Sequence, residues 1–120
     1  MKIRVGFGFD VHPLQEGRPL WLGGMQLPAA KGAVGHSDAD VLIHALCDAI
    51  LGAANLSDIG THFSNKDPKW AGMDSKFFLK EVTRMISERG WKIENVDCTV
   101  TLEEPKIKDH ISGMKEVLAP

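Results

Sequence analysis

Apolar and polar positions alternate strictly in the first segment of the chain. The odd positions from Ile3 to Val11 are all apolar, whereas the even positions between them hold charged residues or glycine. A repeat of two residues is typical of a β-strand with one buried face. On the opposite face Asp10 and His12 project in the same direction, with glycines beside them. The pattern therefore predicts a strand that carries a carboxylate and an imidazole on its polar side.

A second alternation, from Val96 to Leu102, predicts another strand. Two short apolar runs, at residues 20–22 and 25–27, flank the Gly23-Gly24 pair. This is the pattern of a β-hairpin closed by a turn with positive φ angles. The sheet is thus expected to receive strands from both halves of the chain.

Apolar residues recur at helical spacing in three further segments, at about residues 40–55, 75–90 and 105–118. Ser37 followed three residues later by Asp40 has the spacing of a capping box, so we expect the first helix to begin there. Three helices are therefore predicted.

The order of elements is strand, hairpin, helix, a long loop over residues 57–72, helix, strand and helix. It predicts an α/β (α+β) fold in which helices cover one face of a small mixed sheet. A chain of 120 residues with 43% hydrophobic content has the size of one compact domain, so we expect a single domain over residues 1–120. Because the sheet has few strands, we expect a partner chain or further sequence beyond Pro120 to complete it.

Charge and cysteine content exclude several classes of protein. The net charge is −2, and no long run of either sign offers a surface for nucleic acid or an anionic membrane. Cys47 and Cys98 form no Cys-x-x-Cys pair, which argues against a disulfide scaffold and a thiolate zinc site. The N-terminus has no apolar stretch of the length of a signal peptide or membrane span. We expect a cytoplasmic protein.

Asp10, His12 and His44 form a ligand set suited to zinc. Three protein ligands leave a fourth position open, where a metal can polarise a phosphoryl oxygen. The alternative is that His12 merely ends a strand and His44 is a solvated helix residue. Asp48, one turn beyond His44, is expected to accept the proton on the other ring nitrogen of His44, although the same pair forms an ordinary hydrogen bond in helices without a metal.

Four further residues suit phosphate or polyol binding. His36 and Ser37 fall at the start of the first helix, where unpaired N–H groups favour an anion. Helix capping by Ser37 and a plain loop role for His36 are the alternatives. Asp58 suits a polyol hydroxyl or a simple turn. Lys106, after Pro105, suits a phosphate or a solvated helix start.

Five stretches occur together and in one order: GFGFDVHPL, GGMQLP, GHSDADVLIHALCDAILGAANLSDIG, KDP and NVDCTVTLEEPKI. In this combination the chain resembles the 2-C-methyl-D-erythritol 2,4-cyclodiphosphate synthase family. The resemblance implies a phosphorus–oxygen lyase of the non-mevalonate isoprenoid pathway. Such an enzyme converts 4-diphosphocytidyl-2-C-methyl-D-erythritol 2-phosphate to the cyclic diphosphate and releases CMP.

The resemblance also implies roles for individual residues. Asp10, His12 and His44 match the zinc ligands, and His36 matches the residue that stabilises the phosphoryl transition state. The matching substrate contacts are Asp10, His12, His36, Ser37, Asp58, Gly60, Phe63, Asn65 and Asp67. The matching cytidine-phosphate contacts are Leu102, Glu104, Pro105, Lys106 and Ile107, and they serve a neighbouring subunit of a homotrimer. The polar face of the second strand and the glycine-rich face of the first are candidates for the subunit contact.

Two departures from the family pattern matter. Asn65 stands where the family commonly has an acidic residue, which affects one hydroxyl contact. Family chains also continue past Pro120 with a strand, a loop and a helix, which bring the glutamate ligand of a second, magnesium- or manganese-type metal. We therefore expect a protein that ends at Pro120 to be weakly active or inactive. The alternatives are a non-catalytic metal- or nucleotide-binding relative and a metal-dependent phosphohydrolase.

Overall fold

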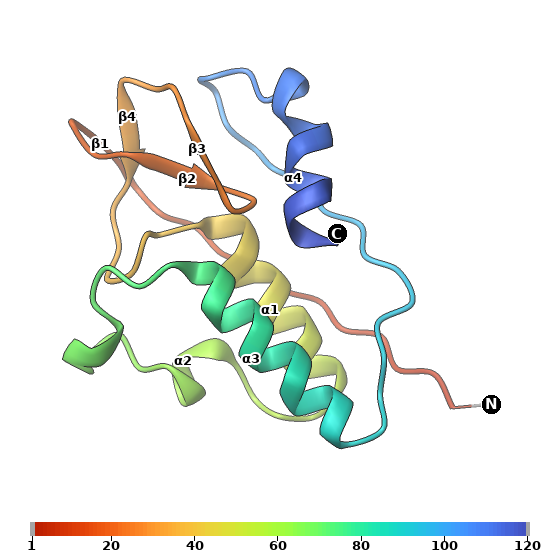
Figure 1. Cartoon of the computed structure of the whole chain (residues 1–120). Helices are drawn as coiled ribbons and strands as arrows, with labels where there is room; N and C mark the ends of the chain where they lie inside the picture. Colours follow the sequence, from red (N-terminus) through yellow and green to blue (C-terminus); the bar gives the residue numbers. More distant parts are fainter. Residues whose placement is uncertain (1, 120) are drawn as a thin grey trace.

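Two helices, α1 (Val41–Ala53) and α3 (Ser75–Glu88), lie side by side in the computed structural model, which describes residues 2–119 (Figure 1). Their N-terminal ends are joined by hydrogen bonds, because the Asp38 N–H donates to the Met73 carbonyl and the Ser75 N–H donates to the Asp38 side chain. The core between them consists of Ile43, Leu46, Cys47, Ile50, Leu51, Phe78, Val82 and Ile86. The two helix starts are thus held next to each other.

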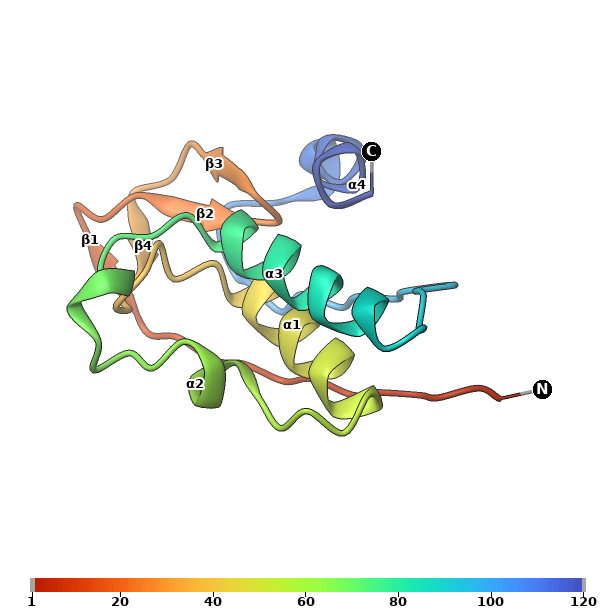
Figure 2. The same ribbon diagram turned by 60° about the horizontal axis from the view of Figure 1, so that its bottom comes forward.

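The predicted hairpin is confirmed. Strands β2 (Leu20–Leu22) and β3 (Met25–Leu27) pair antiparallel, and the turn residues Gly23 and Gly24 have φ angles of 60° and 81°. Only glycine adopts such angles readily. Figure 2 shows the hairpin between the α1 and α3 pair and the last helix. It thus links these two parts of the core.

A second strand pair, β1 (Leu14–Glu16) with β4 (Lys31–Ala33), was not predicted. The last helix, α4 (Ile111–Leu118), follows a short 3-10 turn, η2 (Lys108–His110), and so begins later than Pro105. Its Met114 packs against the leucines of the hairpin. The α/β class is confirmed, with small antiparallel sheets and packed helices.

The first helix starts at a different cap from the one expected. Asp40, not Ser37, is the N-cap of α1, and its Oδ1 atom accepts the Ile43 N–H at 3.1 Å. Ala39 has a φ angle of 59°, so the backbone before Asp40 is not helical. The capping-box interpretation of Ser37 was therefore wrong, and its hydroxyl contacts His44 instead.

The first predicted strand packs with the opposite face to the one expected. Residues 3–11 are extended without a strand assignment, and the apolar side chains of Val5 and Phe7 are 90% and 85% exposed. The glycine face lies on α1 instead: a Cβ atom on Gly8 would lie 1.8 Å from the Ala45 carbonyl oxygen. The backbone approaches the helix closely because these positions carry no side chain.

The second predicted strand also has no strand assignment. Residues 92–101 run along the molecule as an extended segment, and Val96 is 44% exposed (Figure 1). The loop over residues 57–72 contains two short helical turns, α2 (Ile59–His62) and η1 (Pro68–Trp70). Within residues 2–119, no helix combines the length and apolar character needed to cross a membrane.

Candidate metal centre and pocket

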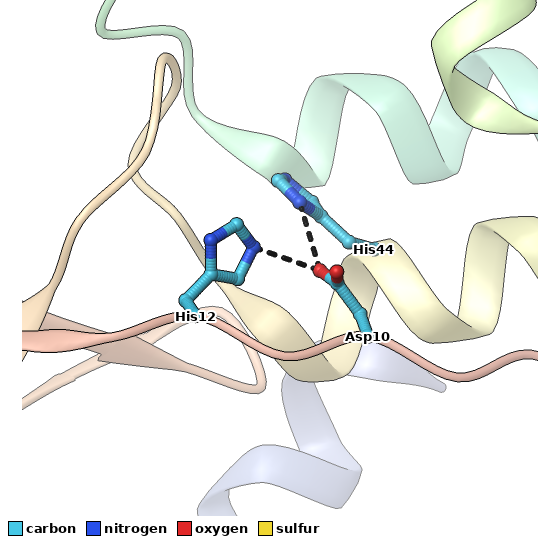
Figure 3. A group of neighbouring side chains, drawn as sticks. All are labelled: Asp10, His12 and His44. Carbon is cyan, nitrogen blue, oxygen red and sulfur yellow. Dashed lines mark hydrogen bonds and ion pairs between the residues drawn. The ribbon is translucent and has the colours of Figure 1, made fainter.

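Asp10, His12 and His44 converge on one point (Figure 3). One donor atom from each side chain lies within 4.8 Å of the other two. The Asp10 Oδ2 atom is 2.8 Å from His12 Nε2 and 3.4 Å from His44 Nδ1. A carboxylate oxygen and two imidazole nitrogens at these separations match the donor set that zinc prefers.

The close approach of the first segment to α1 creates this arrangement. Gly6 and Gly8 rest on the carbonyl groups of Ala49 and Ala45, so the even positions of the segment face the helix. Asp10 continues that face, and His44 lies in the first turn of the same helix. The predicted common direction of Asp10 and the next even residue, His12, is confirmed by their contact.

His12 is held in a defined orientation by the backbone. Its Nδ1 atom lies 2.9 Å from the Val34 carbonyl oxygen, which can only accept, so Nδ1 carries the proton. In a neutral ring, Nε2 then presents a lone pair to the Asp10 carboxylate 2.8 Å away. Two acceptors at this distance require a second proton on His12 or a cation between them. The arrangement therefore fits a metal ion.

The electrostatics of the site favour an ionised carboxylate. Burial raises the pKa of Asp10, but the neighbouring imidazoles of His44 and His12 outweigh burial and hold this pKa below its ordinary value. All three side chains are partly buried. Asp10 is thus ready to bind a cation at neutral pH.

The three side chains lie at a pocket of about 420 Å³. The sequence-predicted residues that line it are Asp10, His12, His36, Ser37, His44, Asp48, Gly60, Phe63 and Asn65. Sequence reasoning missed Val34, Gly35, Ile59, Trp70 and Phe78. The aromatic rings of Phe63, Trp70 and Phe78 pack against one another in edge-to-face and tilted arrangements, with centroids 4.8 to 5.7 Å apart. They give the pocket an apolar wall.

His36 is oriented by the long loop. Its Nε2 atom donates to the Asp67 carbonyl oxygen at 2.8 Å, and its own carbonyl accepts the Gly72 N–H at 2.8 Å. The Asp67 carboxylate caps the following turn by accepting the Lys69 N–H. Asp67 therefore does not line the pocket itself, and its backbone carbonyl instead fixes His36, which does.

The predicted hydrogen bond between Asp48 and His44 is not formed. The Oδ1 atom of Asp48 accepts the Ile59 N–H at 2.8 Å, while His44 Nε2 lies 2.9 Å from the Ser75 hydroxyl. Burial raises the pKa of Asp48, and the nearby charges of Asp58 and Asp10 raise it further, although the Ile59 N–H opposes them. Asp48 still lines the pocket, where it anchors the start of α2.

Other predicted contacts lie away from this pocket. The exposed Asp58 side chain caps α2 by accepting the Thr61 N–H at 2.8 Å. Leu102 and Ile107 pack against the hairpin core, and the Lys106 ammonium donates to the Glu103 carbonyl. Glu104 and Pro105 belong to the same segment and do not line the pocket. Within residues 2–119, the predicted cytidine-phosphate segment is therefore separate from the metal centre.

The fold and the site define a small α/β protein with a candidate divalent-metal centre beside two helix starts. The model of the YgbB family matches residues 3–120, and the chain belongs to this family. It is 66% identical over 119 residues to the 2-C-methyl-D-erythritol 2,4-cyclodiphosphate synthase of Cytophaga hutchinsonii, and 56% identical to that of Bacteroides fragilis. Each alignment covers 99% of this chain and 75% of the relative.

Solved structures agree with this assignment. A CDP-bound 2C-methyl-D-erythritol-2,4-cyclodiphosphate synthase superposes with a TM-score of 0.90 at 43% identity, over 96% of this chain and 77% of the other. The bifunctional IspDF of Campylobacter jejuni gives a TM-score of 0.93 at 42% identity, over 98% of this chain and 32% of the other. The resemblance drawn from the sequence motifs is confirmed.

Proposed function

We propose that this chain acts as a cyclising, CMP-releasing phosphorus–oxygen lyase that forms 2-C-methyl-D-erythritol 2,4-cyclodiphosphate. The observation that carries the proposal is the convergence of Asp10, His12 and His44 at a pocket also lined by His36 and Ser37. The proposal is further supported by relatives of that name that align with 99% of the chain. The substrate is 4-diphosphocytidyl-2-C-methyl-D-erythritol 2-phosphate.

The reaction needs positioning and charge neutralisation rather than a protein nucleophile. An oxygen of the 2-phosphate attacks the nearer phosphorus of the diphosphate, and the bond from that phosphorus to the oxygen of the departing CMP breaks. A bound divalent metal supplies charge neutralisation at the phosphates. His36, fixed by the Asp67 carbonyl, stabilises the negative charge that develops, and Ser37 contacts the substrate.

Phosphorus NMR of the products tests this reaction. Incubation of the whole gene product with the cytidylated phosphate substrate should give CMP and the cyclic diphosphate in equal amounts. Linear phosphate products would support a metal-dependent phosphohydrolase, in which water is the nucleophile. Binding without turnover would support a non-catalytic metal- or nucleotide-binding relative. Either result would overturn the proposed lyase activity.

The proposed metal is zinc, at one ion per chain, held by Asp10, His12 and His44. His44→Ala should abolish stoichiometric zinc, because it removes one of three donors. His62→Ala is the matched control, since His62 contacts the Leu56 carbonyl outside the pocket and should leave the zinc content unchanged. Stoichiometric zinc in the His44→Ala protein, measured by elemental analysis, would count decisively against this assignment.

We also propose that the chain forms a homotrimer with active sites at the subunit boundaries. The separation of Lys106 and its neighbours from the metal centre supports a cytidine site built from two chains. The exposed apolar row Ile3, Val5, Phe7, Phe9 and Val11 offers a surface for the contact. The glycine-rich face, expected earlier as a candidate contact, lies on α1 and is not available.

Mixing variants tests the shared site. His44→Ala chains mixed with Lys106→Ala chains should regain part of the activity, because some boundaries then pair two intact halves. Each variant alone is the control. Sedimentation of a monomer at micromolar concentration, or no rescue despite proven subunit exchange, would contradict the trimer with shared sites.

A further inference from the structure

His44 has two hydroxyl neighbours at the ring nitrogen that faces away from Asp10. Its Nε2 atom lies 2.9 Å from Ser75 Oγ and 3.1 Å from Ser37 Oγ, while Nδ1 faces Asp10. A hydroxyl can donate or accept, so these two contacts alone leave the position of the ring proton open. The tautomer decides whether Nδ1 has a lone pair for a metal. A further contact must therefore determine which ring nitrogen of His44 carries the proton.

Asp38 fixes the direction of the Ser75 hydroxyl. One oxygen of its carboxylate, Oδ1, forms a short hydrogen bond with Ser75 Oγ and also accepts the Asp40 N–H at 3.1 Å. The other oxygen accepts the Ser75 N–H at 2.9 Å. A carboxylate accepts only, so the hydroxyl proton of Ser75 points to Asp38. The lone pairs of Ser75 Oγ then remain for His44.

We propose that Ser75, oriented by Asp38, is a positioning residue that holds His44 with the proton on Nε2 and the lone pair on Nδ1. The Nε2–H donates to Ser75 Oγ at 2.9 Å. The competing acceptor, Asp10 Oδ2, lies farther from the ring, at 3.4 Å from Nδ1, so the shorter contact keeps the proton on Nε2. The Nδ1 lone pair is thereby presented beside Asp10. Ser75 is fully buried, so water does not compete for its hydroxyl. His12 reaches the equivalent state through the Val34 carbonyl. The two imidazoles are thus oriented by partners from different parts of the chain.

A purely structural role for Ser75, as the first residue of α3, makes different predictions. It requires only a small residue that fits a buried space, and alanine meets that requirement. Ser37 is the matched comparison, since its hydroxyl also contacts His44 Nε2 but accepts the Ala39 N–H rather than donating to a carboxylate. Ser75→Ala and Ser37→Ala therefore each remove one hydroxyl group that contacts the same nitrogen.

Nitrogen NMR of the metal-free chain reads the tautomer directly. Spectra recorded at about pH 8.5, well above the ordinary imidazole pKa, should show the His44 proton on Nε2 in the unaltered chain and in Ser37→Ala. Ser75→Ala should show a mixture, because Ser37 can then donate to Nε2 and move the ring proton to Nδ1. A proton on Nδ1 in the unaltered chain would overturn the proposal, whether or not the Ser75→Ala chain folds.

Zinc affinity, measured against a competing chelator, is the second readout. Ser75→Ala should weaken zinc binding by about 10- to 100-fold, as loss of the partner of a metal-bound histidine does. Ser37→Ala should change it by less than about threefold. Equal affinities for the two variants, with matching thermal stability, would leave Ser75 only a structural residue.

This inference rests on the proposed metal site, and the two fail separately. The tautomer is read without metal, so it stands or falls on the Asp38, Ser75 and His44 contacts alone. Stoichiometric zinc in His44→Ala would instead overturn the metal assignment while leaving the tautomer result intact.

Discussion

The N-terminal end of helix α1 and one flank of the same helix differ in how completely the chain covers them. At its N-terminal end the buried polar side chains have partners within the chain: the Asp40 carboxylate accepts N–H groups of Gly23, Gly24 and Ile43. Along the flank lie two extended segments, residues 3–9 and 92–101, in which apolar side chains are exposed. Across the described residues, no backbone hydrogen bond ties either segment to a neighbouring strand.

The difference separates two functions of one helix. The metal centre depends on contacts that a single chain makes, whereas the exposed flank needs a covering surface, which the proposed trimer provides. Changes to the exposed apolar side chains of the flank should therefore affect assembly and leave the metal centre alone. Changes at the helix start should do the reverse.

Phe7→Asp should have the largest effect. A charge in the middle of the exposed apolar row should weaken association of the chains by about 1,000-fold or more, which corresponds to about 4 kcal/mol. Sedimentation equilibrium measures this change. Zinc affinity should stay within about threefold, because Phe7 is exposed and does not line the metal pocket. Phe7→Leu is the control and should assemble normally. An unchanged oligomeric state in Phe7→Asp would show that the apolar row does not form the interface.

Asp40→Ala should lower the free energy of unfolding by about 3 kcal/mol, since it removes the helix cap and the partner of two turn N–H groups. Urea denaturation measures this loss. Asp97→Ala, on the exposed segment, should change stability by less than about 0.5 kcal/mol. Equal losses of unfolding free energy in Asp40→Ala and Asp97→Ala would contradict the difference between the helix start and the exposed flank.

Gly8→Ala should cost about 1 to 3 kcal/mol, because its methyl group meets the Ala45 carbonyl and pushes the segment off the helix. Asp10 moves with the segment, so zinc affinity should fall by about tenfold. Gly52→Ala, on α1 with no atom within 4 Å of the added carbon, should instead stabilise the chain by up to about 1 kcal/mol. Thermal unfolding measures the two stability changes, and chelator competition measures the change in zinc affinity. Unchanged zinc affinity in Gly8→Ala would show that the metal site does not depend on the contact between Gly8 and α1.

Local sequence patterns predicted the elements whose stability is local. The hairpin around Gly23 and Gly24 and the helices α1 and α3 were all predicted, because turn glycines and helical periodicity act over a few residues. The buried face of residues 3–11 was predicted wrongly. Alternation indicates that two faces differ, but only the glycines reveal which face can approach a helix.

The candidate site was likewise predicted only in part from the sequence. The residues that converge at the pocket were predicted from residue types and family motifs, and the structure brings Asp10, His12 and His44 together. The partner of His44 was not predicted, since Ser75 lies 31 residues away and a sequence offers only neighbours such as Asp48. Trp70 gave no signal either, because an aromatic residue in a loop has no periodic pattern to mark it.

The glycine contact on α1 has a consequence for thermal motion. Side chains hop between rotamers, so a spacing set by side-chain packing fluctuates with them. At Gly6 and Gly8 no side chain separates the first segment from α1, so the backbone of the segment lies directly against the backbone of the helix. The distance between the backbones that carry Asp10 and His44 is therefore set by a direct backbone contact, and it should vary little as temperature rises.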